Sequence, residues 1–213
     1  MAELFLNLLK GVPATLAVTI GAFAIGAVLA MPLVLMRRSE SLLLRIPARL
    51  YIDVVRGIPP VVWLFIIFFG LGSGVIKLSS IQAAMAGLGL VSAAYLAEIY
   101  RGGFMALPNG QNAAAVALGM TRADTLRFVL VPQVLRVSIP PMATFFVSLL
   151  KDSTVASTIG VRDVMMFVSQ GAQASGGGFA PFLFAAVLYI GMSIPVAFFS
   201  RVMDEKLRSR MAK

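Results

Sequence analysis

Long uncharged runs divide this chain of 213 residues into blocks. A helix needs about 20 mostly apolar residues to cross the hydrocarbon core of a bilayer. Three runs before residue 100 carry no charge at all, and two more, after residue 130, are mainly apolar. The pattern predicts an all-α integral membrane protein, a single transmembrane domain over 1–213, with five spans at about 11–36, 51–76, 78–101, 134–150 and 179–200.

Composition and charge agree with this prediction. Apolar residues make up 59% of the chain and charged residues only 13%, against about 25% charged residues in a soluble domain. The net charge of +9 argues for orientation in a membrane rather than for nucleic-acid binding, because the basic residues cluster at the ends of apolar runs. Five spans place 14 Lys and Arg residues on one side and 4 on the other. The N-terminus is therefore expected outside and the C-terminus in the cytoplasm.

The chain lacks the residues that several kinds of chemistry require. The chain contains no cysteine and no histidine, which removes the usual thiolate and imidazole metal ligands and the commonest general base. None of its lysines belongs to a phosphate-binding G-x-x-x-x-G-K-[ST] loop. We therefore expect a transport subunit that is not itself an enzyme and has no metal or cofactor of its own.

The segment 104–131 is too polar to face lipid and is predicted to form a cytoplasmic loop with helices of its own. Asn109 can cap a short helix over 110–118. Gly119 stands where a left-handed residue would end that helix.

A second helix is expected directly after this turn. Thr121 can cap it, and Asp124 stands three residues later, as in a capping box. Pro132 is expected just past its end.

The helix over 110–118 has a small apolar surface, formed by Ala113, Ala114, Ala115, Ala117 and Leu118. Two interpretations stay open at this point. The surface can pack on the protein's own spans, or it can dock into a groove of a partner protein.

A family resemblance enters with the segment AYLAEIYRGGFMALPNGQNAAAVALGMTRADTLRFVLVPQVLR over 94–136. It resembles the signature region of permease subunits of ATP-binding-cassette importers, in which an E-A-A word is followed by a glycine and later a proline. Ala114, Ala115, Gly119 and Pro132 match this pattern. The chain is similar to the polar amino acid branch through RGIPPVVWLFIIFFGLG (56–72), AYLAEIYRGG (94–103) and SLLKDSTVASTIGV (148–161).

The resemblance implies a type I permease fold in a bacterial cytoplasmic membrane. It also implies a separate ATPase subunit, an extracytoplasmic amino-acid-binding protein and a second permease subunit, identical or different. By resemblance, the coupling helix that contacts the ATPase involves Gly110, Gln111, Ala113, Ala114, Ala115, Leu118, Gly119 and Thr121. The family's glutamate falls on Ala113, so its charged contact is replaced here, or the chain is the weaker half of a heterodimer.

Ionisable side chains in or near the spans are candidates for the solute path, because charge is costly in lipid. Lys151 and Asp152 can form a pair on the outer surface, or hold the charged ends of an amino acid with the help of Ser153 and Thr154. The Pro140–Pro141 pair is expected to disrupt the helix below them.

Three further features have structural and functional interpretations. Glu98 and Arg101 lie three residues apart and are expected to form a structural pair, with gating as the alternative. Trp63 packs in the core or faces lipid, or it lines the solute path. Asp53 and Arg56 can also pair.

The sequence favours an ATP-driven importer of an amino acid. Within the same machine type, the solute can instead be an opine, a sulfur amino acid or a small peptide. An ion-coupled secondary transporter is the alternative from another class, and the coupling loop argues against it. A membrane enzyme is disfavoured because no pair of intramembrane carboxylates is evident.

Overall fold

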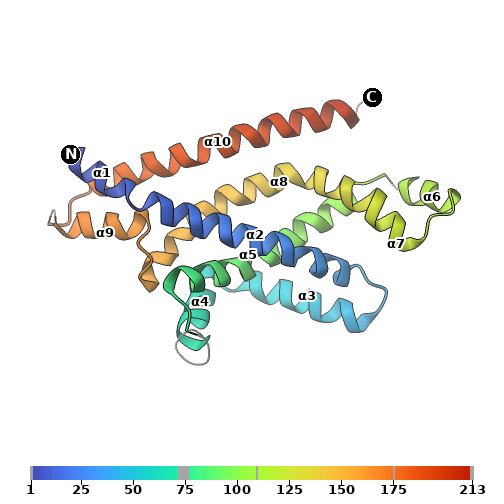
Figure 1. Cartoon of the computed structure of the whole chain (residues 1–213), viewed down its shortest axis with the longest axis horizontal. Helices are drawn as coiled ribbons and strands as arrows, with labels where there is room; N and C mark the ends of the chain where they lie inside the picture. Colours follow the sequence, from blue (N-terminus) through green and yellow to red (C-terminus); the bar gives the residue numbers. More distant parts are fainter. Residues whose placement is uncertain (1, 72–76, 109, 175, 212–213) are drawn as a thin grey trace.

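Helices make up the regular structure in the described part of the chain. The computed structural model describes residues 2–71, 77–108, 110–174 and 176–211. The elements in chain order are α1 (Ala2–Leu9), α2 (Val12–Arg37), α3 (Leu42–Gly57), α4 (Pro60–Phe65), the π-helical turn η1 (Ile66–Leu71), α5 (Ser80–Met105), α6 (Gly110–Ala117), α7 (Arg122–Asp124), the π-helical η2 (Thr125–Leu130), α8 (Val131–Asp152), the 3₁₀ segment η3 (Ser153–Ile159), α9 (Val164–Ala174) and α10 (Ala180–Met211). Figure 1 shows α1 and α9 at one end of the molecule and α6 at the other.

Four helical stretches of the described residues are long and apolar enough to cross a membrane: Glu3–Arg37, Ser80–Met105, Arg122–Ile159 and Ala180–Glu205. A bent pair of helices, Leu42–Gly57 with Pro60–Leu71, is the fifth candidate. The predicted all-α membrane architecture is therefore confirmed, and each predicted span falls on one of these five stretches.

The second span differs from the continuous helix expected over 51–76. It begins at Leu42, and its two halves meet at an angle of 106°. Ile58, just before Pro59, is extended with φ −112° and ψ 134°, because a residue before proline is driven out of the helical region. The indole N–H of Trp63 donates to the Val55 carbonyl across the bend at 3.2 Å. Residues 72–76 of the predicted span lie outside the described residues.

The fourth span is longer than predicted, because prolines do not end it. The helix that Thr121 caps continues through Pro132 into α8. Pro132 follows the π-helical η2, in which the Val131 N–H donates to the carbonyl of Leu126, five residues back. Pro140 and Pro141 also lie inside α8. The expected helix end at Pro132 and the disruption at Pro140–Pro141 are therefore wrong.

The centre of the fold is the close contact between α2 and α5. Alanines and glycines of α5 are buried along it, as the composition of that span suggested. A side chain at Gly26 would overlap Cβ of Ser92 and approach the Ser92 carbonyl carbon to 2.9 Å. Only a residue without Cβ lets the two backbones come this close.

A smaller buried cluster closes the end of the molecule that holds α1 and α9. There the Asp163 side chain is 1% exposed, and its Oδ1 accepts from the Met166 N–H at 2.8 Å, which caps α9. Thr15 of α2 accepts from the Val164 N–H at 3.2 Å. Burial raises the pKa of Asp163 to about 6, and backbone N–H groups around the carboxylate oppose the shift.

We predict that Gly26→Ala forces α2 and α5 apart and destabilises the protein by about 1–3 kcal/mol, as overpacked cores do. Thermal unfolding of the purified protein in detergent measures this effect. Gly191→Ala is the matched control, because a Cβ at Gly191 meets no atom within 4 Å. Equal melting temperatures for the two variants would show that the close approach at Gly26 does not limit the packing.

Candidate functional site

The short helix α6 (Gly110–Ala117) begins at the predicted residue and ends one residue before the predicted end at 118. Gly119 adopts the left-handed conformation with φ 74°. Its N–H donates to Val116 at 2.9 Å, and the Met120 N–H donates to Ala115 at 3.1 Å, which together form a Schellman ending. Asn109, the predicted cap at the other end, lies outside the described residues.

Thr121 caps the next helix as predicted, with Oγ1 accepting from the Asp124 N–H at 3.1 Å. The Asp124 carboxylate accepts from the Thr121 hydroxyl at 2.6 Å. The aspartate is shorter than the usual glutamate, so this contact takes the place of the backbone contact of a full capping box. The tight turn between α6 and α7 is thus fixed from both sides.

One face of α6 packs on the protein and the other faces solvent. Ala115 is 3% exposed and packs against the protein. The Gln133 side chain of α8 donates to the Gln111 side chain at 3.1 Å. Ala113 and Ala114 are exposed, as are Gly110, Val116, Ala117, Leu118 and Thr121. Packing on the protein's own helices therefore describes the face with Ala115, and docking on a partner stays a prediction for the exposed face.

The four residues predicted for the solute path at the C-terminal end of α8 have two kinds of environment. Ser153 and Thr154 bind carbonyls of their own helix end, at Leu150 and Lys151, both at 2.8 Å. Lys151 and Asp152 are exposed and line different cavities, of about 280 and 520 Å³. Lys151 and Asp152 follow each other in α8, so their side chains point about 100° apart. This explains why they line different cavities.

The larger of these two cavities lies between α5 and α8. Its lining consists of Tyr95, Ile99, Pro141, Thr144, Phe145, Ser148 and Asp152. Thr144, Ser148 and Asp152 are spaced by four residues and form a polar stripe on one face of α8. The sequence analysis missed Thr144, Ser148 and Tyr95, although the four-residue spacing of polar residues in an apolar span was a usable signal.

Trp63 is not among the residues that line this cavity. Its ring packs against the buried cluster that includes Ile52, Val55 and Ala94, and its N–H closes the bend between α3 and α4. This position agrees with the core interpretation of Trp63.

Glu98 is the centre of an ion cluster that joins three helices. It pairs with Arg101 at 3.0 Å, as predicted, and also with Arg37 of α2 at 2.6 Å and Arg56 of α3 at 4.0 Å. The expected Asp53–Arg56 pair is wrong, because Asp53 pairs with Arg49 at 3.4 Å, one turn back. The three cations can meet one carboxylate because α2, α3 and α5 pack side by side.

The Glu98 cluster borders the cavity between α5 and α8. The Arg56 guanidinium lies 5.1 Å from the centroid of the Tyr95 ring, and that ring stacks on Phe145 at 5.4 Å. Both rings line the cavity. A displacement of Arg56 would therefore change the wall of the cavity.

Comparison with known proteins decides the family. The model of the family described as "Binding-protein-dependent transport system inner membrane component" matches residues 22–209. The chain belongs to this family. It is 34% identical to the probable amino-acid ABC transporter permease protein YckA of Bacillus subtilis over 96% of this chain and 90% of the relative. It is 35% identical to the octopine transport system permease protein OccM of Rhizobium radiobacter, over 92% and 83% of the two chains.

A solved structure gives the same result for the fold. The crystal structure of an amino acid ABC transporter with histidines superposes with a TM-score of 0.87 and 30% identity, over 97% of this chain and 96% of that chain. The protein is thus a permease subunit of a binding-protein-dependent amino acid ABC importer, a multi-pass protein of the inner membrane. ATP hydrolysis takes place in a partner chain. This assignment decides against the secondary-transporter and membrane-enzyme alternatives.

We predict that Glu98→Gln destabilises this permease by about 3–5 kcal/mol, the usual cost of removing one partner from a largely buried ion pair. The matched control is Asp53→Asn, whose pair with Arg49 is mostly exposed and contributes about 0–1 kcal/mol. Chemical unfolding in detergent measures both. Equal losses for the two variants would contradict the central role of Glu98.

Proposed function

We propose that the cavity between α5 and α8 is part of the solute path and that α6 is the coupling helix. The observation that carries this proposal is the continuity of the helical stretch Arg122–Ile159. Its beginning lies beside α6, and its later part carries Thr144, Ser148 and Asp152 along the cavity. A displacement of α6 can therefore be transmitted to the wall of the cavity through one continuous helical element.

The contacts of α6 support its coupling role. Ala115 is buried and Gln111 accepts from the Gln133 side chain of α8, while Ala114 and Leu118 are exposed. Since the family's glutamate is replaced by Ala113, docking on the ATPase rests on apolar contact and shape. Membership of this family implies that the importer contains an ATPase and uses a binding protein. Placing the ATPase at α6 is our proposal.

Orientation and assembly complete the mechanism. The 14-to-4 distribution of basic residues supports an extracytoplasmic N-terminus and a cytoplasmic position of α6. We propose that a second permease subunit, identical or different, completes the path, with one ATPase beneath each coupling helix. Closure of the ATPases on ATP would then switch the spans between outward and inward access.

The solute is proposed to meet α8 through its charged groups. Asp152 lines the proposed path and can bind an ammonium group. Lys151 lies on a neighbouring face, where it can attract a carboxylate. An opine remains an alternative because the relative OccM is named for octopine, and a sulfur amino acid or a small peptide remains open. Gating by Glu98 and Arg101 stays a prediction, supported by their position beside the cavity.

We predict that Ala114→Arg lowers ATP-driven uptake at least about tenfold, since a bulky charge in a small docking surface removes apolar contact. ATP hydrolysis should no longer respond to the loaded binding protein, while the amount of permease in the membrane stays unchanged. Uptake and ATPase activity in proteoliposomes measure this. Ala106→Arg, at an exposed alanine just after α5, is the control. Unchanged coupling in Ala114→Arg would rule out this surface as the contact.

We predict that Asp152→Asn raises the solute concentration needed for half-maximal uptake about tenfold or more, because a charged hydrogen bond to the solute is lost. Basal ATP hydrolysis should not change. Glu40→Gln is the matched control, since its side chain is 93% exposed in the α2–α3 turn. Uptake assays with a panel of labelled amino acids provide the measurement. An Asp152→Asn permease with normal affinity and selectivity would exclude Asp152 from the path.

A further inference from the structure

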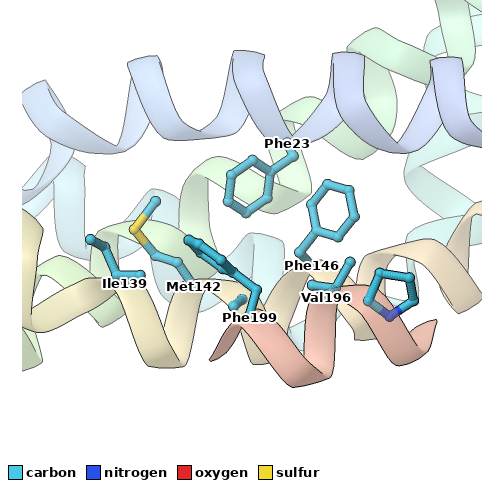
Figure 2. A pocket seen from close by; sticks show the side chains of 8 residues that line it. Phe23, Ile139, Met142, Phe146, Val196 and Phe199 are labelled. Atoms are coloured by element: carbon cyan, nitrogen blue, oxygen red, sulfur yellow. The ribbon is translucent and has the colours of Figure 1, made fainter. Parts of the chain in front are cut away.

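The helix pair α8 and α10 has an apolar side and a polar side. On the apolar side, α2, α8 and α10 bound an apolar groove of about 450 Å³, and every side chain that lines it is apolar (Figure 2). On the polar side lies a cavity of about 280 Å³ between α8 and α10. Its polar lining consists of Thr144, Ser148, Lys151, Ser200 and Arg201. Because it contains two cations, we call it the two-cation cavity.

The two-cation cavity adjoins the proposed solute path. Thr144 and Ser148 line both this cavity and the cavity toward α5 that contains Asp152. Lys151 and Arg201 belong to candidate membrane spans. Charged side chains in such spans usually face a water-filled cavity rather than hydrocarbon, and they often mark a substrate pathway. The charges on α8 and α10 are therefore suited to an extension of the path.

The two cations are the groups of this cavity that remain available to a solute. The hydroxyls of Thr144 and Ser200 both donate to the Pro140 carbonyl, at 3.2 and 3.3 Å. Within the described part of the chain, no ion pair includes Lys151 or Arg201, and both residues are exposed. An anion that enters the cavity therefore meets two positive charges that are not paired with a described carboxylate.

The two cations begin at different levels of α8. Arg201 directly follows Ser200, and the bond from Ser200 to Pro140 fixes the level at which α10 meets α8. Lys151 lies eleven residues beyond Pro140, which is about 16 Å along a helix axis. Both side chains are long, and both line the same cavity. The cavity can therefore offer one cationic group to each of two separate carboxylates.

The charges of the two adjoining cavities define a class of solute. Among the described residues that line them, the charged ones are Asp152, Lys151 and Arg201. The charges behind the wall toward α5 are also net positive, because three guanidinium groups share the Glu98 carboxylate. This set complements one ammonium group and two carboxylates. Acidic amino acids and imino diacids have this charge pattern.

We propose that the two-cation cavity binds a second carboxylate of the solute, so that the importer carries a dicarboxylic amino compound. This inference rests on the solute path proposed above. Asp152 binds the ammonium group, and Lys151 binds the carboxylate next to it. Arg201 binds the distal carboxylate, because its planar guanidinium can donate two parallel hydrogen bonds to one carboxylate.

The test measures the binding of labelled solutes to the purified permease–ATPase complex without the binding protein, so that permease contacts alone set the affinity. Two matched pairs of solutes are compared. Glutamate differs from glutamine by one carboxylate, and octopine differs from arginine by a group that adds one. In at least one pair, we expect the dicarboxylate to bind about tenfold or more tightly, the usual contribution of a hydrogen bond between charged groups. Equal affinities within both pairs would overturn the proposal.

Variants of the two cations test their separate roles. Arg201→Gln should weaken the dicarboxylate about tenfold or more and leave its monocarboxylate counterpart unchanged, which also shows that the variant is folded. Lys151→Gln should weaken both members of the pair. Arg201→Lys keeps the charge and should keep most of the preference. The control Arg45→Gln removes a charge from an exposed position of α3 and should change neither affinity. Equal weakening of both solutes by Arg201→Gln would contradict the assignment.

An anionic lipid is the other source of an anion for this cavity. Binding is therefore repeated with added phosphatidylglycerol and with added phosphatidylcholine. Unchanged affinity for the dicarboxylate supports the solute site, whereas competition by phosphatidylglycerol alone assigns the cations to a lipid phosphate and overturns the proposal. Failure of the path itself is recognised separately, because Asp152→Asn would then leave the affinity of every solute unchanged.

Discussion

The close contact of α2 with α5 positions the other spans. Gly26 allows the backbone of α2 to reach Ser92 of α5, and the remaining helices attach to this pair. The Tyr51 hydroxyl of α3 donates to the Leu90 carbonyl of α5 at 2.8 Å, and the Glu98 cluster joins α2, α3 and α5 by ion pairs. In hydrocarbon, where apolar burial gives little driving force between helices, close backbone packing and polar contacts supply the association.

Helix α8 connects the proposed coupling helix to the proposed solute path. It begins beside the proposed coupling helix, presents a polar stripe to α5 and packs its other faces on α2 and α10. The Phe145 ring stacks on Tyr95 toward the proposed path, and the Phe146 ring contacts Phe23 of α2. Neighbouring residues of α8 therefore contact different helices, because successive side chains point about 100° apart.

Proline has three different effects in this chain. The Pro59–Pro60 pair breaks the second span into two helices at 106°. Pro132 follows a π-helical turn, and Pro140 and Pro141 remain inside a continuing helix. The Pro140 carbonyl accepts from the Thr144 hydroxyl at 3.2 Å and from the Ser200 hydroxyl of α10 at 3.3 Å. Neighbouring side chains and helices can satisfy backbone groups near a membrane proline, so the residue type alone does not decide between a break and a continuous helix.

The sequence by itself determined the membrane class, the number of apolar blocks and the left-handed turn at Gly119 that ends α6, because apolar length, charge position and a left-handed glycine act locally. It also indicated Asp152 and the Glu98–Arg101 pair. Tertiary structure decided that Arg56 joins Glu98, that Lys151 and Asp152 face different cavities, and that Thr144 and Ser148 share a wall with Tyr95. It also formed the apolar groove from α2, α8 and α10. These features depend on which helices touch and on how each is rotated about its axis, and a linear pattern of apolar residues leaves both open when every face of a helix is apolar.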